Sequence, residues 1–281
     1  MDQVESTESR PGSPDDEGRQ TSVFRGLGPS GFARLRLTRA AVVDLIDLPP
    51  AQVAQKLEAG MHQPSTRPGP VTVAFMNMRN YVVSRRHPES ESAFASMDQV
   101  YPDGVGLQVA RRLLGLCSYP RVSGTDTIPL LMQRLRPGTR VFLLGGTTDL
   151  SIAAGVGFSR LFPSLILAGV HHGYFSAAQD DGVVAAIVAA RPDVLLIGMG
   201  SPVQECWLAR QRDRLPVRLA ICVGGLFHYW AEDLRRAPQK LRDVGLEWLW
   251  ILAQQPGKWR VYSIDAARFG VALLRLKRSA T

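Results

Sequence analysis

The stretch DVLLIGMGSPVQECW, residues 193–207, restricts the fold more than any other part of the chain. Its apolar run VLLI is short and unbroken, which is typical of a strand buried on both faces of a parallel sheet. Gly198 and Gly200 then allow a tight turn and the close approach of a ligand to the main chain. Ser201 follows as an N-cap, with proline at the first helical position. A strand, a glycine turn and a helix N-terminus present free N–H groups, so we expect Gly200 and Ser201 to bind phosphate.

Gln204 has two interpretations that do not exclude each other. The spacing Ser201-x-x-Gln204 is that of a capping box, in which Gln204 only completes the start of the helix. The same side chain also lies beside the glycine turn, where it can bind a ligand. The Gly-x-Gly-Ser-Pro spacing is not that of a dinucleotide fingerprint, so the motif alone does not identify a cofactor.

Apolar runs alternate with helical patterns along most of the chain. We expect strands at 41–46, 71–76, 140–144, 165–170, 194–197 and 219–223, and helices at 50–59, 127–135, 150–162, 177–190 and 201–214, with a further helix opening after Asp103. Glycine turns follow three of the strands, at 145–146, 198–200 and 224–225. This pattern predicts an α/β fold, with a parallel sheet covered by helices on both faces.

Composition adds a division of the chain into three parts. Residues 1–31 are rich in Ser, Gly, Pro and acids and are expected to be disordered, the sheet domain spans 34–233, and a helical appendage spans 234–281. The net charge is +8, and residues 235–278 hold ten Lys/Arg against Asp243, Glu247 and Asp265. The basic excess therefore belongs mostly to the appendage.

The appendage is basic, apolar and rich in tryptophan. Basic amphipathic helices of this kind suit an anionic bilayer surface, whereas the alternative is that they cover the sheet and turn their charges to solvent. We favour membrane contact. No run of 18 apolar residues and no secretory signal is present, and three cysteines at no metal-like spacing indicate reduced thiols. The sequence thus predicts a cytoplasmic protein that is peripheral at the inner face of the cell membrane.

Several polar residues follow expected strands. Asn77 lies at the carboxyl edge of the sheet, where open α/β sheets bind ligands, or it caps the next helix. Asp103 precedes Gly104 at a helix start, where the dipole favours an acid, and its minimal role is an N-cap. Arg121 either holds a phosphate bidentately or is an ordinary surface arginine. Gly145 and Gly146 form a second glycine turn and are expected to contact substrate.

Two further side chains have chemically reactive groups. The pair His171-His172 could suggest a metal, but no Asp, Glu, Cys or His set completes a site, so we interpret His172 as part of a polar pocket wall. Cys206 lies one helical turn from the glycine loop. It is either a nucleophile or a buried packing thiol, and we favour the second interpretation.

Taken together, the motifs resemble those of the bacterial glycosyltransferases called the WecG/TagA/CpsF family. The resemblance covers roughly residues 70–250, in the right order, and rests on FMNMRNYVVS (75–84), DGVGLQVARRLLG (103–115), RVSGTD (121–126), VFLLGGT (141–147), HHGYF (171–175), PDVLLIGMGSPVQECWLAR (192–210), VGGLFHYWA (223–231) and RRAPQKLRDVGLEWLW (235–250). Each piece is weak alone, and the set is specific.

The resemblance implies a Rossmann-like fold and an inverting transfer of a sugar, such as N-acetylmannosamine or glucose, from a UDP donor. The implied acceptor is a sugar on undecaprenyl diphosphate, in the synthesis of a cell-surface polysaccharide or exopolysaccharide. The family's proposed base corresponds to Asp103, and its pocket Asn, Arg and Gln correspond to Asn77, Arg121 and Gln204. Its appendage is thought to close the site at the membrane, so Arg235, Arg236 and Arg242 are expected to reach diphosphates.

Some residues depart from the family pattern. Phe75 stands where many members have Thr, His228 replaces the more usual Asp, and Pro102 precedes Asp103 where Ala is common. The first two lie at the expected pocket and leave the donor sugar open. No Asp-x-Asp occurs in the chain, so a diphosphate-bound metal has no obvious anchor and we expect metal-independent activity without a cofactor.

Two other classes of function compete with this interpretation. The first is another nucleotide-binding Rossmann enzyme, such as an NAD(P)-dependent one, and the missing GxGxxG after the first strand counts against it. The second is a non-enzymatic protein that binds a membrane surface or nucleic acid through its basic tail. That reading leaves three glycine turns unexplained, and we expect no nucleic-acid partner. A homo-oligomer is compatible with the sequence.

Overall fold

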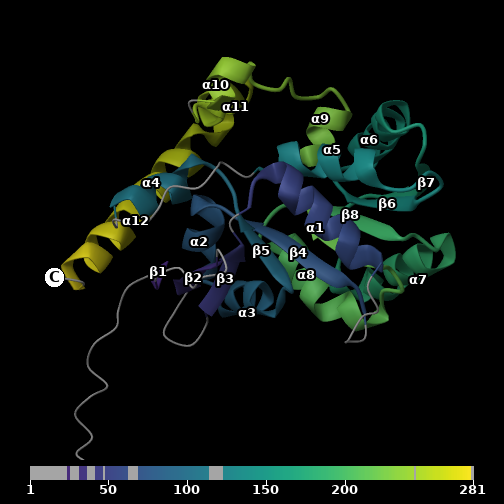
Figure 1. Ribbon diagram of the computed structural model, residues 1–281, viewed down its shortest axis with the longest axis horizontal. Helices are drawn as coiled ribbons and strands as arrows, with labels where there is room; N and C mark the ends of the chain where they lie inside the picture. Colours follow the sequence, from purple (N-terminus) through teal and green to yellow (C-terminus); the bar gives the residue numbers. More distant parts are fainter. Residues whose placement is uncertain are drawn as a thin grey trace, which may run out of the picture.

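The computed structural model describes residues 24–25, 32–36, 42–46, 48–62, 69–113, 123–243 and 245–279. Its strands form one sheet in the order β1-β2-β3-β5-β4-β9-β8-β6-β7 (Figure 1). The strands are β1 Phe24–Arg25, β2 Phe32–Arg36, β3 Val42–Ile46, β4 Val71–Met76, β5 Gln99–Pro102, β6 Arg140–Gly145, β7 Ile166–His171, β8 Val194–Gly198 and β9 Leu219–Cys222.

Every pairing from β3 to β7 across the sheet is parallel, so the predicted parallel sheet is confirmed. Two features were not predicted. β1 and β2 extend the sheet with antiparallel pairings beyond β3, and β5 lies between β3 and β4. β5 has only four residues, QVYP, and its terminal proline hides it from a search for apolar strands. The remainder of the segment 1–31, expected to be disordered, lies outside the described residues.

Twelve α-helices are described around and beside the sheet. They are α1 Pro50–His62, α2 Met78–Ser84, α3 Pro88–Ser96, α4 Val105–Leu113, α5 Gly124–Arg134, α6 Thr148–Leu161, α7 Asp180–Ala190, α8 Val203–Gln211, α9 Leu226–Trp230, α10 Gln239–Asp243, α11 Glu247–Gln254 and α12 Trp259–Ser279. α3 was not expected from the sequence, and α2 was expected only as the helix that Asn77 would cap. The sequence of these two segments has no clear apolar stripe that would indicate a helix.

The alternation of strand side chains creates one hydrophobic core on each face of the sheet. Along β8, Leu195 and Ile197 pack into the core that includes α2, α3, α4, α7 and α8. Val194 and Leu196 point to the opposite face, into the core that includes α1, α5, α6 and α9. Helices therefore cover both faces of the sheet. The unbroken apolar runs predict this, because a strand that is buried on both faces has no polar positions facing solvent.

The C-terminal helix α12 runs along the side of the molecule beside α2 (Figure 1). Phe269 is buried against Tyr81, with ring centroids 5.6 Å apart in an edge-to-face arrangement. Asp265 is also buried and lies 3.5 Å from the Nε of Arg79. None of the described helices combines the length and the apolar character that a membrane span requires.

Gly157 provides a test of the packing between α6 and α9. A Cβ atom at this position would lie 1.8 Å from the carbonyl oxygen of Trp230, which is backbone and cannot rotate away. Gly157→Ala should therefore lower the free energy of unfolding by about 1–3 kcal/mol in urea denaturation, despite the better helix propensity of alanine. Gly182→Ala on α7 is the matched control, since a Cβ there meets nothing within 4 Å. The control should raise stability by about 0.5–1 kcal/mol, and equal effects of the two variants would contradict the packing.

Candidate active site

A cavity of about 1540 Å³ lies at the carboxyl edge of the sheet. Its walls come from the loops that follow β4, β5, β6, β7, β8 and β9, together with residues of α11 and α12. In an open α/β sheet this edge is the usual ligand site. Gly146, Gly198, Gly200, Gly224 and Gly225 of the glycine turns line this one cavity together with Asn77 and Asp103, whereas Gly145 is not among the lining residues.

At the carboxyl edge of the sheet, glycines of neighbouring strands and loops pack closely against one another. A Cβ atom on Gly145 would lie 2.4 Å from the carbonyl carbon of Gly198 on the neighbouring strand. A Cβ on Gly173 would lie 2.9 Å from the Cα of Gly145. No larger residue fits these contacts without displacing backbone. Side chains are thus excluded from these contacts, and peptide groups can approach a ligand directly.

Gln204 joins two of the turns. It is almost fully buried, and its Oε1 accepts hydrogen bonds from the backbone N–H of Gly200 at 3.2 Å and of Gly224 at 3.1 Å. Its Nε2 donates to Oε1 of Glu205 at 2.8 Å. The expected capping box is wrong, because α8 begins at Val203 with Pro202 as its N-cap, so Ser201 lies one residue too early. Gln204 therefore fixes the relative position of two glycine turns, and Ser201 lines the cavity instead of capping.

Asn77 and Asp103 follow paired positions of neighbouring strands, since Met76 lies opposite Pro102 in the register. Asn77 does cap α2, because its Oδ1 accepts from the N–H of Asn80 at 2.9 Å. The N–H of Asp103 donates to the carbonyl oxygen of Met76 at 2.7 Å, which holds the loop after β5 against the loop after β4. Both residues line the cavity. Asp103 is partly exposed there and lies two residues before α4 begins.

The loop after β7 differs from the prediction. Gly173, Tyr174 and Phe175 line the cavity, and His172 does not. The N–H of Gly173 donates to the carbonyl of Gly146 at 2.8 Å, which turns the following residues toward the cavity. The His172 ring stacks instead on His171, with centroids 4.5 Å apart. Tyr174, which is 75% exposed, was missed, although an aromatic residue in a loop at the carboxyl edge was the available signal.

Residues far along the chain complete the cavity; His228 was expected at the pocket, whereas Asp233 and the lining residues of the appendage were missed. His228 lines it, and its Nδ1 lies 2.6 Å from Oδ2 of Asp233, which lines it as well. From the appendage the lining residues include Glu247, Trp248, Ile251, Leu252 and Trp259. The expected Arg121 lies outside the described residues.

Of the three tail arginines expected at the diphosphates, none is among the described lining residues. Arg236 and Arg242 bind the carboxylate of Asp126 beside the cavity. Arg235 is exposed, and its backbone carbonyl accepts from Trp250 Nε1 at 3.0 Å. Contact of these arginines with substrate stays a prediction.

Charge on the cavity wall is mostly negative. Among the described lining residues, the acidic ones outnumber Arg79, and they are Asp103, Asp149, Glu232, Asp233, Glu247 and Asp265. Within the described part of the chain, the positive partners available to an anionic ligand are Arg79, backbone N–H groups and helix N-termini. Among the described residues, no group of three or more His, Cys, Asp or Glu side chains is arranged to hold a metal ion.

The thiol of Cys206 does not behave as an activated nucleophile. Burial raises its pKa, and the neighbouring charge of Glu205 raises the pKa further. A thiolate is the reactive form, so these two effects keep the sulfur unreactive near neutral pH. This favours the packing interpretation of Cys206. Cys222 lines the cavity but is fully buried, and burial holds the pKa of its thiol well above the usual range.

Glu205 makes stability depend on pH. Burial raises its pKa, and the hydrogen bond from Gln204 offsets this only in part. Because the folded-state pKa lies above the unfolded value of 4.5, the contribution of Glu205 is fully present below 4.5 and is lost as pH rises through the folded-state pKa. Glu205→Gln keeps an acceptor for Gln204 and removes this loss. The variant should gain stability over wild type as pH rises, measured by urea unfolding between acid and neutral pH.

Glu89→Gln on the exposed face of α3 is the control for this titration. Its unfolding free energy should follow the wild-type pH curve. If Glu205→Gln also runs parallel to wild type across the pH range, the buried carboxyl does not titrate with a raised pKa.

Comparison with known proteins gives two findings. The family model described as "Glycosyl transferase WecG/TagA/CpsF family" matches residues 40–281. The chain is also similar to a protein of Bacillus spizizenii named N-acetylglucosaminyldiphosphoundecaprenol N-acetyl-beta-D-mannosaminyltransferase. The two are 27% identical over 196 residues, which cover 69% of this chain and 75% of that protein.

Proposed function

Because the chain belongs to the WecG/TagA/CpsF family of glycosyl transferases, we propose that it moves a hexose or N-acetylhexosamine, of the N-acetylmannosamine or glucose type, from a UDP-sugar to a sugar on undecaprenyl diphosphate. The product serves the synthesis of a cell-surface polysaccharide or exopolysaccharide. The observation that carries the proposal is a cavity lined both by glycine turns and by Asp103. The similar protein from Bacillus spizizenii is named for an acceptor of this lipid-linked kind.

The glycine turns are the proposed site of the donor diphosphate. The turns after β6 and β8 lead into the starts of α6 and α8, where the helix dipole favours anions. The acidic lining residues cannot balance a diphosphate, which leaves the main-chain N–H groups of these turns and Arg79 as its available partners among the described residues. Balancing the charge in this way requires no metal ion, so the transfer is metal-independent in this proposal.

Asp103 is the proposed general base. It takes the proton from a hydroxyl group of the acceptor sugar, and the acceptor oxygen forms a bond to the anomeric carbon of the donor. The bond between that carbon and the β-phosphate oxygen breaks, and UDP leaves with the electron pair. Attack opposite the leaving group inverts the anomeric centre. Amides directed at the diphosphate stabilise the charge that develops on it.

Asp103→Asn tests this assignment. The amide is isosteric but cannot accept the proton, so transfer should fall by about 10²–10⁴ while UDP still raises the melting temperature as in wild type. Transfer is measured with a radiolabelled UDP-sugar panel and a prenyl-diphosphate-linked sugar, in the presence of EDTA. Asp213→Asn, an exposed acid outside the cavity, is the control and should keep full activity. Near-normal turnover by folded Asp103→Asn would refute its role as the base.

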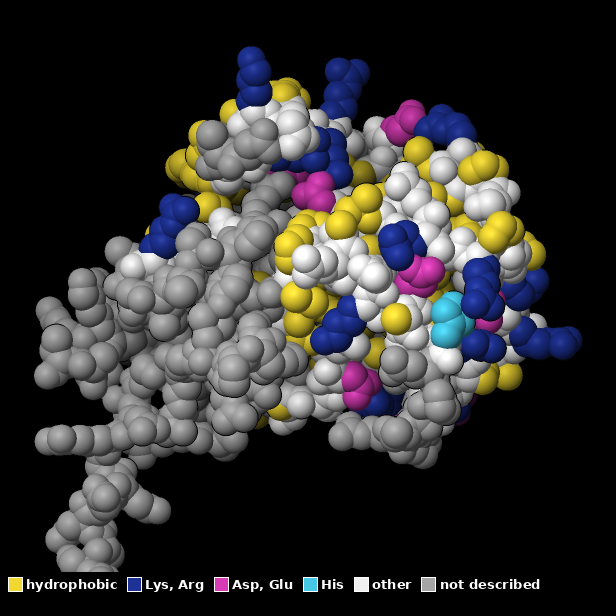
Figure 2. All heavy atoms as spheres, viewed as in Figure 1, with side chains coloured by type: hydrophobic (Ala, Val, Ile, Leu, Met, Phe, Trp, Pro, Cys, Tyr) yellow, Lys and Arg dark blue, Asp and Glu magenta, His cyan; other side chains and the backbone are white. Residues whose placement is uncertain are grey.

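The appendage is the proposed contact with an anionic membrane surface at the cytoplasmic face. Figure 2 shows Lys and Arg side chains projecting beside hydrophobic ones at the end of the molecule formed by α10 and α11. Arg235, Lys240 on α10 and Arg260 on α12 are exposed. The exposed large apolar residues of the appendage are Leu246, Trp248, Leu249, Trp259, Ile264 and Val271.

A liposome experiment tests the membrane contact. Each basic residue near an anionic surface contributes on the order of 1 kcal/mol, so Lys240→Glu/Arg260→Glu should weaken binding to anionic liposomes at least about tenfold. Binding of wild type should also fall as salt rises. The control is Arg86→Glu/Arg136→Glu, which reverses two exposed charges outside the appendage. Equal losses in both double variants would mean that net charge, and not the appendage, binds the membrane.

A further inference from the structure

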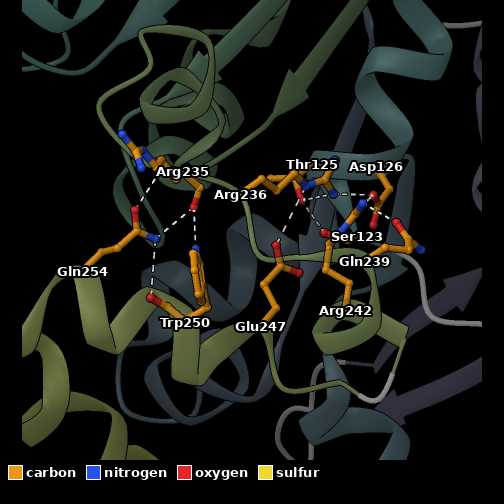
Figure 3. Close-up of polar contacts among 10 residues, drawn as sticks. All are labelled: Ser123, Thr125, Asp126, Arg235, Arg236, Gln239, Arg242, Glu247, Trp250 and Gln254. Atoms are coloured by element: carbon orange, nitrogen blue, oxygen red, sulfur yellow. Dashed lines mark hydrogen bonds and ion pairs between the residues drawn. The ribbon is translucent and has the colours of Figure 1, made fainter.

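One carboxylate, that of Asp126 at the start of α5, binds two arginines of the appendage. Oδ1 of Asp126 accepts from Nη2 of Arg236 and, at 3.0 Å, from Nη1 of Arg242 (Figure 3). The two arginines lie 110 and 116 residues away along the chain. The side chains of all three residues are largely shielded, with exposures of 20–30%. A shared carboxylate in such surroundings balances two charges that would otherwise repel each other.

Each arginine has a second contact that defines its orientation. Arg236 also donates to Oγ1 of Thr125 at 3.2 Å, and Arg242 donates to the side chain of Gln239 (Figure 3). Oγ1 of Thr125 is in turn 2.8 Å from Oγ of Ser123, which is buried and lines the cavity. A continuous set of hydrogen bonds therefore runs from the appendage to the cavity wall.

The segment 235–242, which contains these arginines, is hydrogen-bonded to α11. The N–H of Arg235 donates to Oε1 of Gln254 at 2.8 Å, and its carbonyl accepts from Trp250 Nε1 and from Gln254 Nε2 (Figure 3). These bonds join residue 235 to two turns of α11. Trp248 and Ile251 of the same helix line the cavity. The position of this wall therefore depends on where the segment 235–242 is held.

We propose that Asp126 is a positioning residue that docks the appendage and thereby forms the acceptor side of the cavity. It acts through Arg236 and Arg242 and itself touches no reacting atom. The donor side does not depend on it, because the glycine turns are held by the sheet and by Gln204. The assignment of the two sides rests on the proposed function.

Asp126→Asn tests the proposal, because an amide of the same shape cannot balance two guanidinium charges. The KM for a prenyl-diphosphate-linked sugar should rise about 10- to 100-fold, while the dissociation constant for UDP stays within about twofold of wild type. Trypsin should cut the segment 235–242, which contains Arg235, Arg236, Lys240 and Arg242, faster than in wild type. Asp126→Glu restores the charge and should recover most of the acceptor affinity and the protection.

The matched control is Glu58→Gln. Glu58 binds Arg134 at the other end of α5, at 2.7 Å, so the control removes a carboxylate–arginine pair from the same helix without touching the appendage. It should leave the KM and the trypsin pattern unchanged. A folded Asp126→Asn variant with wild-type KM and protection overturns the proposal. A lower acceptor KM also overturns it, since Asp126 would then sequester arginines that substrate needs.

The two readouts separate this proposal from the proposed function. A wild-type protein that transfers no sugar to a lipid-linked acceptor refutes the function. The trypsin comparison still decides whether Asp126 holds the appendage, because it requires no activity.

Discussion

The contact between Gly145 and Gly198 fixes the edge of the sheet on which the site is built. Two neighbouring parallel strands end in glycines whose backbones touch, and a single Cβ atom would separate them. Gly173 packs on the same point from a third loop, and Gln204 joins the turn after β8 to the turn after β9. Such contacts leave no freedom to move one turn alone. These contacts tie the turns to the sheet and to one another, which favours preorganised amide donors.

The opposite wall is held by a different kind of interaction. Few buried apolar contacts join α10 and α11 to the sheet domain, and Leu252 is the buried residue of α11. Charge pairs on Asp126 and the Arg235 backbone bonds hold that segment instead. Charge pairs weaken with salt and with partial exposure, whereas glycine packing does not. One cavity thus combines closely packed glycine turns with a wall of lower local stability, an arrangement that allows a bulky acceptor to enter.

The sequence predicts the parts of this molecule that depend on local patterns. Strands β4, β6 and β8 are apolar runs followed by turn signals, so both the parallel sheet and the edge that holds Asn77 follow from them, whereas Asp103 follows the unpredicted β5. Gln204 lines the cavity beside the glycine turn, but its bond to Gly224 was not predicted because Gly224 lies 20 residues away. Asp126 was not recognised for the same reason. Long-range pairing leaves no periodic pattern in a sequence. The prediction for His172 was wrong for another reason: a backbone hydrogen bond of Gly173 decides which residues of this loop face the cavity.

The net charge of +8 shows how such pairing changes the meaning of composition. Ten basic residues crowd the last part of the chain, and counting them suggests a uniform cationic surface. Arg236 and Arg242, however, share the carboxylate of Asp126, and Arg236 also lies 4.0 Å from Glu247, so the pair contributes less to the outer field than two free arginines would. Arg268 lies 3.7 Å from the buried Asp265, so the charge of a third arginine is also partly offset. Lys240 and Arg260 are exposed and have no carboxylate partner among the described residues, so they are the charges that the proposed membrane contact would use. In the proposed membrane contact, docking and surface attraction therefore fall to different arginines and lysines of the appendage.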